Sequence, residues 1–300
     1  MSPRAALAVL SCVAVACRAA PIPEGERYPA GTGFRAVDRV VDGTRLRVID
    51  AGPRVGAPVV FIHGFGASVY TWRSTLGPVV AAGYRAIAFD NRGFGFSDKP
   101  AHGYDNAAYT RLVTALLDSL GVSSAVLVGH SMGGDVIVEA ALALGDRVAG
   151  IVWVDTYGQL TEPETPEQVE AFLKPFRDDF VGTTRSFVRG MFAPGTDPVL
   201  VEEIASDMSS APPDVALDAL RHAYANDGPV MAALPRLGVP IVAINADYQP
   251  TETASLSRYG VETVIATRVG HFLMIEDADQ FNRLLTEIVR TRMQCPGIAS

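Results

Sequence analysis

The stretch "AVLVGHSMGGD", Ala125 to Asp135, gives the clearest indication of the fold. Its first residues are apolar and typical of a strand, and a helical pattern runs from Met132 to Leu144. Ser131 lies between the two, in the pentapeptide Gly-His-Ser-Met-Gly. A sharp strand-to-helix turn presents a serine hydroxyl clear of neighbouring side chains, and Gly129 and Gly133 leave room for strand and helix to approach. We therefore predict that Ser131 is a nucleophile at the end of a buried strand.

The sequence around this stretch predicts an α/β sheet. Six short, almost continuously apolar runs are typical of parallel strands covered on both faces: "APVVFIHGF", "YRAIAFD", "SAVLVGH", "AGIVWVD", "VPIVAINAD" and "ETVIATRVGH". Before them, residues 33–51 alternate on both sides of an Asp42-Gly43 turn, which predicts an antiparallel hairpin. Helical patterns between and after the strands, at 106–120, 132–144 and 277–293, indicate right-handed crossovers. We expect a mostly parallel, eight-stranded sheet flanked by helices.

The alternation of strands and helices breaks once. Between Asp155 and Leu237 the sequence is helical and punctuated by proline, with no convincing strand. We interpret residues 156–236 as a helical lid inserted after the sixth strand. The core is then formed by residues 21–155 and 237–300.

Composition excludes several kinds of protein. The 300 residues are 48% hydrophobic, and a net charge of -8 with interspersed signs argues against nucleic acid as a partner. Three cysteines, two of them near the N-terminus, cannot form a disulfide framework in the body of the chain. The sequence has no cluster of metal ligands and no phosphate-binding glycine fingerprint. We expect neither a metal nor a cofactor.

The N-terminus "MSPRAALAVLSCVAVACRAAP" predicts export. A short basic start at Arg4 precedes an apolar run of small residues from Ala5 to Cys17, which is too short to span a bilayer. "AVAC", ending at Cys17, satisfies a small-residue cleavage rule and also resembles a bacterial lipoprotein signal. Cys12, in "VLSC", is a competing candidate. Residues 1–20 are thus an export signal, and either a plain leader or membrane attachment through a lipidated cysteine remains open.

Four motifs carry a family resemblance. They are His63-Gly64-Phe65-Gly66, "FDNRGFGFSDKP" at 89–100, "GHSMGG", and "VGHFLMIED" near the C-terminus. In this order they resemble the α/β-hydrolase superfamily, in the branch of serine hydrolases that carries a helical lid. The similarity runs from about residue 33 to the end. It implies that the backbone N–H groups of Phe65 and Met132 form an oxyanion hole.

The same resemblance implies a base and an acid that follow the nucleophile in the order serine, acid, histidine. His271, after the last predicted strand, fits the base. In most relatives the acid follows the penultimate strand, where this chain has "VAINADYQPTET" with Gln249 at the usual position. We favour Asp247, two residues earlier. Asp155, after the preceding strand, is the alternative acid, and Glu252 is a third.

The remaining candidate residues surround this triad. Phe65, His130, Phe172 and Phe176 are candidate substrate-binding residues. Phe172 and Phe176 recur at helical spacing on one face of the predicted lid, which could line a pocket. Asp90 and Arg92 lie in a tight glycine turn and are interpreted as structural.

The expected activity is ester hydrolysis through a Ser-His-Asp triad and an acyl-enzyme, on a small molecule with an apolar portion. Ser131 argues against epoxide hydrolases and haloalkane dehalogenases, whose nucleophile in this superfamily is an aspartate. Carbon-carbon bond hydrolysis and cofactor-free perhydrolysis use the same residues and stay open. So does a receptor that binds a ligand without turnover.

Overall fold

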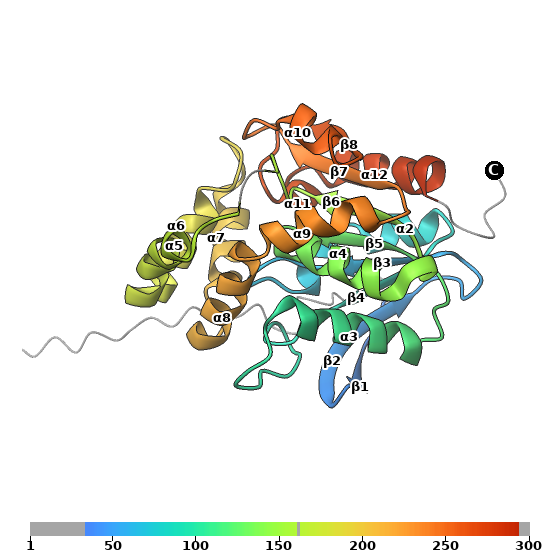
Figure 1. Cartoon of the computed structure of the whole chain (residues 1–300), viewed down its shortest axis with the longest axis horizontal. Helices are drawn as coiled ribbons and strands as arrows, with labels where there is room; N and C mark the ends of the chain where they lie inside the picture. The colour runs from blue at the N-terminus through green and yellow to red at the C-terminus, as the bar shows by residue number, and fades with distance from the viewer. Residues whose placement is uncertain (1–33, 161–162, 294–300) are drawn as a thin grey trace, which may run out of the picture.

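A computed structural model describes residues 34–160 and 163–293 (Figure 1). These residues form one eight-stranded sheet in the order β1-β2-β4-β3-β5-β6-β7-β8. The strands are β1 (Ala36–Val41), β2 (Thr44–Ala51), β3 (Pro58–Ile62), β4 (Arg85–Phe89), β5 (Ala125–His130), β6 (Val148–Val154), β7 (Ile241–Ala246) and β8 (Val261–Ala266). β1 and β2 pair antiparallel with their neighbours, and β3 to β8 are parallel. The predicted fold class is confirmed.

Burial explains the two kinds of strand pattern. Every residue of β4, β5, β6 and β7 is buried, which is why these strands appear as continuous apolar runs. Of the hairpin strands, β1 lies at the edge of the sheet and is buried only at its last residue, and the first five residues of β2 alternate between buried and half-buried. Their turn places Asp42 at φ 47° and Gly43 at φ 70°, a conformation that aspartate and glycine tolerate best.

Helices cover both faces of the sheet (Figure 1). The predicted helices at 106–120, 132–144 and 277–293 are confirmed as α3, α4 and α12. In Figure 1, α3, α4 and α9 lie in front of the sheet, and α2 lies behind it. The helices outside the segment between β6 and β7 are α2 (Leu76–Ala81), α3 (Asn106–Ser119), α4 (Met132–Leu144), α10 (Thr253–Ser257), α11 (Leu273–Glu276) and α12 (Ala278–Arg292), with 3-10 turns η1 (Val69–Trp72) and η2 (Gly145–Arg147).

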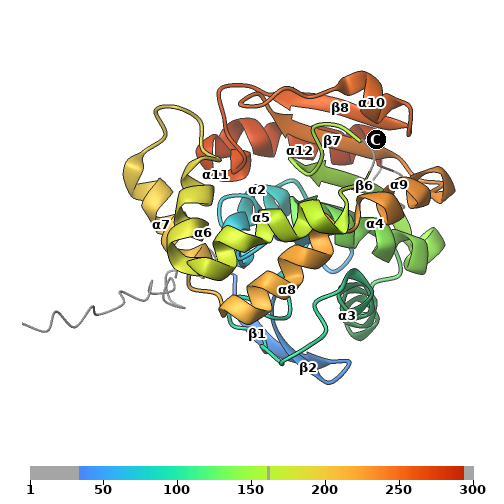
Figure 2. The ribbon, with the colours of Figure 1, turned by 60° about the vertical axis from the view of Figure 1, so that its left-hand side comes forward.

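In the described part of the segment between β6 and β7, the regular secondary structure is helical. It contains α5 (Pro166–Asp178), α6 (Phe180–Arg189), α7 (Pro198–Met208), α8 (Pro213–Tyr224), α9 (Asp227–Ala233) and η3 (Leu234–Arg236). A capping box between Thr165 and Gln168 starts α5, since each side chain bonds the other residue's backbone N–H. In Figures 1 and 2, α5, α6, α7 and α8 gather beside one end of the sheet. We refer to α5 to α8 as the helical cover.

The parallel arrangement brings distant residues together. Ser131 follows β5, Asp155 follows β6, and His271 lies beyond β8. The carboxyl ends of parallel strands meet at one edge of a sheet, so these residues share that edge.

The predicted export signal at residues 1–20, with Cys12 and Cys17, lies outside the described residues. Among the described helices, none combines the length and the apolar character needed to cross a bilayer.

Candidate active site

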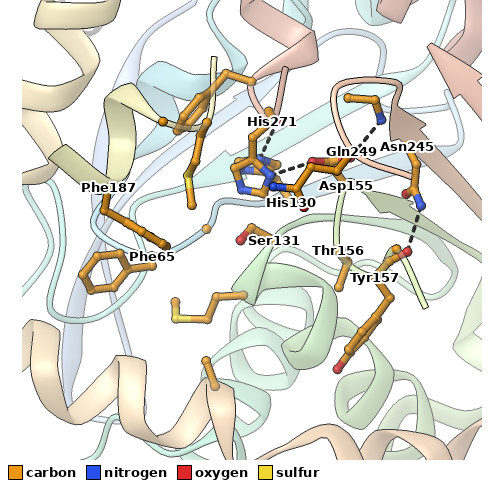
Figure 3. A pocket seen from close by; sticks show the side chains of 18 of the residues that line it. Phe65, His130, Ser131, Asp155, Thr156, Tyr157, Phe187, Asn245, Gln249 and His271 are labelled. Atoms are coloured by element: carbon orange, nitrogen blue, oxygen red, sulfur yellow. Dashed lines mark hydrogen bonds and ion pairs between the residues drawn. The ribbon is translucent and has the colours of Figure 1, made fainter. Parts of the chain in front are cut away.

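A cavity of about 670 Å³ opens at this edge of the sheet. Ser131, Asp155 and His271 line it, and residues of the helical cover, among them Phe187 and Met208, close its other side. Figure 3 shows His271 and Asp155 side by side near Ser131. The cavity therefore brings together a hydroxyl, an imidazole and a carboxylate from three separate parts of the sequence.

Ser131 occupies a strained turn. Its φ of 51° and ψ of -125° are rare for a residue with a side chain. The turn is fixed from both sides, because the Ser131 N–H donates to the Val154 carbonyl at 3.1 Å and its carbonyl accepts from the Gly134 N–H at 2.7 Å. The structure thus shows the predicted sharp bend between β5 and α4.

Glycine is required where α4 starts. A Cβ atom on Gly133 would lie 2.4 Å from the Ile62 carbonyl oxygen, and one on Gly129 would lie 2.4 Å from the carbonyl oxygen of Gly133. Both contacts are with backbone atoms, which cannot rotate away.

We expect Gly133→Ala to destabilise the protein by about 2–3 kcal/mol, because β3 and α4 must separate to accept the methyl group. Gly238→Ala is the matched control, since no heavy atom lies within 4 Å of a Cβ built there. Urea unfolding of the two variants and the wild type measures the difference. Equal stabilities for the two variants would contradict the close approach of β3 and α4.

His271 is paired with Asp155. The His271 Nδ1 atom lies 2.7 Å from Asp155 Oδ2, and both side chains are about 90% buried. The other carboxylate oxygen of Asp155 accepts from the Ala246 N–H at 2.8 Å. Asp155 also has a positive φ of 46°, which turns its side chain toward the end of β7. This carboxylate is therefore oriented to hold the imidazole with its Nδ1 protonated.

The preference for Asp247 as the acid is wrong in this geometry. Asp247 is exposed, and its Oδ1 accepts from the Val269 N–H at 3.3 Å instead of contacting His271. Glu252 is also exposed and starts α10 outside the cavity lining. The physical reason is the strand order: β6 lies between β5 and β7, so a residue at its end reaches the histidine beside Ser131.

Phe65 and Met132 both line the cavity next to Ser131. Met132 is the first residue of α4, so its N–H has no carbonyl partner within the helix. The loop that carries Phe65 is fixed by His63, whose Nε2 accepts from the Asn91 N–H at 2.8 Å. The two residues predicted for the oxyanion hole thus line the same cavity as the predicted nucleophile.

The turn after β4 supports that loop. Asp90 is fully buried and accepts from the N–H groups of Val69 at 2.8 Å and Phe96 at 2.7 Å. Arg92 donates to the His102 carbonyl at 2.6 Å. Neither residue lines the cavity, in agreement with the structural interpretation.

Comparisons with known proteins agree with this fold. A family model described as the alpha/beta hydrolase fold matches residues 57–198. A protein of Synechocystis sp. with the provisional name non-heme chloroperoxidase is 30% identical to this chain over 205 residues. The match covers 64% of this chain and 74% of the relative. The chain is an α/β hydrolase.

Other relatives of the hydrolase match it over shorter segments. Epoxide hydrolase A of Mycobacterium tuberculosis is 38% identical over 148 residues, which is 48% of this chain and 45% of the relative. The chain spans less than half the length of the first three such relatives. Among solved structures, Est816, described as an N-acyl homoserine lactone degrading enzyme, has a TM-score of 0.70 and 27% identity, covering 85% of this chain and all of that one.

His130 supports the histidine of the hydrolase. Its Nε2 lies 3.0 Å from the His271 carbonyl oxygen, and because a carbonyl can only accept, Nε2 carries the hydrogen. The two imidazole rings lie 4.5 Å apart between centroids. Complete burial, followed by the neighbouring His271, holds the pKa of His130 well below its usual value, so His130 is neutral.

This burial makes folding sensitive to acid. The unfolded chain protonates His130 near pH 6.5 whereas the folded chain does not, so stability falls as the pH drops below that value. One such proton accounts for about 1.4 kcal/mol between pH 7.5 and pH 5.5. We expect His130→Gln to lose less stability over this interval, by about that amount, in urea unfolding at both pH values. A wild-type pH slope retained in the variant would refute a neutral His130.

The walls of the cavity differ from the prediction in part. Phe65 and His130 line it as predicted, but Phe172 and Phe176 do not. Phe176 packs behind Phe65 and Phe187, with ring centroids 6.5 and 5.4 Å away, and Phe172 stacks on Tyr224 at 4.0 Å. Their helical spacing therefore reflects packing of the helical cover, as it does for most amphipathic helices.

Glu276 joins the histidine loop to the helical cover. Its Oε1 accepts from the Gly270 N–H at 3.0 Å, and its Oε2 accepts from the Ala193 N–H at 3.0 Å and the Thr196 hydroxyl at 2.8 Å. The His271 N–H also donates to the Met191 carbonyl at 2.8 Å. Sequence reasoning missed this junction, whose only signal was the acidic end of "VGHFLMIED".

Polar residues on the far side of the cavity were also missed. Asp135, Tyr157 and Asn245 line it, and the Tyr157 hydroxyl donates to Asp135 Oδ1 at 2.7 Å. Asp135 ends the stretch that contains the nucleophile, and Tyr157 lies two residues after Asp155. Their positions close to Ser131 and Asp155 could have indicated a role in the site. The neighbouring sequence, however, does not show that these side chains face one cavity.

Proposed function

We propose that this α/β hydrolase cleaves esters of small molecules through Ser131, His271 and Asp155. The observation that carries the proposal is the 2.7 Å contact between His271 and Asp155 in the cavity that Ser131 lines. A serine hydroxyl needs a base, and a base needs a group that orients it. All three chemical roles are represented by side chains at one edge of the sheet.

The reaction follows from these roles. The Ser131 Oγ attacks the ester carbonyl carbon while His271 Nε2 takes the hydroxyl proton, and the carbonyl π electrons move to oxygen. Collapse of this tetrahedral intermediate breaks the bond to the alcohol, which leaves with the proton from His271. Water then attacks the acyl-enzyme, again losing its proton to His271, and Ser131 is regenerated with release of the carboxylic acid.

Three features stabilise the charges that form. The N–H groups of Phe65 and Met132 point to the developing oxyanion in this proposal, and the N-terminus of α4 adds its partial positive charge. Asp155 stabilises the imidazolium that His271 becomes. The helical cover acts as a lid that restricts water and contributes Phe187 and Met208 to an apolar binding wall.

The names of the relatives point to two other reactions. Epoxide hydrolases of this superfamily attack with an aspartate, so Ser131 argues against that activity here. Perhydrolysis is a second candidate, because relatives are named non-heme chloroperoxidases. In that reaction hydrogen peroxide replaces water in the attack on the acyl-enzyme and releases a peracid, and the same three residues suffice.

The test is steady-state hydrolysis of p-nitrophenyl esters from acetate to dodecanoate, combined with labelling by a fluorophosphonate. We expect turnover that peaks at one acyl length and a covalent adduct that mass spectrometry maps to Ser131. Peracid formation from acetate and hydrogen peroxide measures the second candidate. A folded protein that forms no adduct and turns over no ester would overturn the proposal and favour a ligand receptor.

A further inference from the structure

The charges around the cavity have one sign. Asp135, Asp155 and Glu164 line it, and the described lining residues include no lysine or arginine. Asp155 is engaged by His271, which leaves two carboxylates in the wall with no role in the proposed chemistry. A negatively charged substrate would be repelled by such a wall, because screening by solvent is weak in a recessed site.

The cavity has an apolar side and a polar side. In Figure 3, Phe65 and Phe187 lie on one side of Ser131, and Thr156, Tyr157, Asn245 and Gln249 lie on the other. Asp135 belongs to the polar side, because its Oδ1 accepts from the Tyr157 hydroxyl at 2.7 Å. A substrate held at Ser131 therefore extends one arm over phenylalanine rings and the other toward Asp135.

Asp135 is positioned to interact with a charged group on that second arm of the substrate. It lies in the first turn of α4, the helix that begins directly after Ser131. Its side chain lines the cavity although only 5% of the residue is exposed, so its charge acts in a largely dehydrated environment. The first turn of a helix also favours a negative charge, which keeps a carboxylate compatible with this position.

Three tyrosines, Tyr157, Tyr224 and Tyr248, also line the cavity. Burial, followed by the charges of Asp155 and Glu276, raises the pKa of Tyr248, so its ring stays neutral at ordinary pH. Neutral aromatic faces next to a carboxylate are the surroundings that bind ammonium groups.

Building on the proposed ester hydrolysis, we propose that the site selects esters that carry an ammonium group on one arm, and that Asp135 is the residue that determines this selection. The apolar arm lies against Phe65 and Phe187. A positive charge near Asp135 raises kcat/KM by about tenfold or more over a neutral ester of the same shape. Carboxylate-bearing esters are poor substrates.

The test compares esters of equal shape and different charge. One pair places the charge on the alcohol, as butyrylcholine against 3,3-dimethylbutyl butyrate. A second pair places it on the acyl group, as ethyl 4-(trimethylammonio)butanoate against ethyl 5,5-dimethylhexanoate, with monoethyl glutarate as the anion. We expect at least one pair to favour the cation by about tenfold in kcat/KM, and the anion to be the slowest substrate.

Asp135→Asn identifies the residue responsible. The amide keeps an oxygen for the Tyr157 hydroxyl and removes the charge, so the preference for the cation should fall about tenfold. Asp146→Asn, at an exposed carboxylate in η2, is the control that keeps the wild-type preference. If Asp135→Asn does not fold, inhibition of the wild type by choline and by 3,3-dimethylbutanol replaces it, with tighter inhibition by choline expected.

The possible failures are distinguishable. If p-nitrophenyl esters are not hydrolysed, the proposed function fails. If they are hydrolysed but neither pair favours the cation, or choline inhibits no better than its neutral analogue, the selection by charge is overturned and esterase activity stands. If Asp135→Asn keeps a wild-type preference for the cation, the assignment of this selection to Asp135 is overturned.

Discussion

Replacing Ser131 with alanine is expected to lower ester hydrolysis by about 10⁴- to 10⁶-fold, because the variant has no oxygen to form the acyl-enzyme. Residual rate comes only from binding and from the N–H groups at Phe65 and Met132, which can still polarise a carbonyl toward water. Single-turnover and steady-state assays with the best p-nitrophenyl ester measure the loss.

The substitution removes one atom, and the turn is held by backbone hydrogen bonds of Ser131 that alanine retains. Circular dichroism and the thermal midpoint should therefore match the wild type. Substantial activity in a folded Ser131→Ala variant, or a fluorophosphonate adduct elsewhere in it, would disprove the assignment of the nucleophile.

Asp155→Asn is expected to lower kcat by about 10³- to 10⁴-fold. Its amide oxygen can still accept from the Ala246 N–H, so the side chain keeps its position. The amide nitrogen then faces His271 Nδ1 and donates to it, which forces the hydrogen onto Nε2. In that tautomer the imidazole cannot take the proton of Ser131.

Asp247→Asn is the matched comparison. It makes the same change of one atom at the acid that the sequence favoured, but the residue is exposed and its side chain accepts from the Val269 N–H. We expect kcat within about twofold of the wild type, since such surface changes have small effects. A large loss in Asp247→Asn with little loss in Asp155→Asn would reverse the assignment of the acid.

The elements of the fold could be predicted because each depends on local pattern. A run such as Val126 to Val128 is apolar at every position, which distinguishes a strand buried on both faces from the alternating strands of the hairpin at Asp42. Ser131 and His271 could be predicted as site residues for the same reason, because each lies in a short motif formed with its sequence neighbours.

The acid and the cavity walls could not be predicted in this way. Asp155 and Asp247 each follow an apolar strand. The sequence does not show which of these strands lies next to β5, or which of the two carboxylates is exposed. Phe172 and Phe176 have the spacing of one helix face, but whether that face meets a cavity or other side chains depends on how helices pack.

The strand-turn-helix that presents Ser131, the parallel sheet and the helical segment between β6 and β7 follow from the local sequence, because they depend on periodicity and on glycine at fixed positions. The pairing of His271 with Asp155, and the cavity that Asp135 and Tyr157 share with Phe65, required the folded chain. Those contacts join residues separated by up to 116 positions. They depend on strand order and helix packing, which arise from burial of the whole core and not from any one segment.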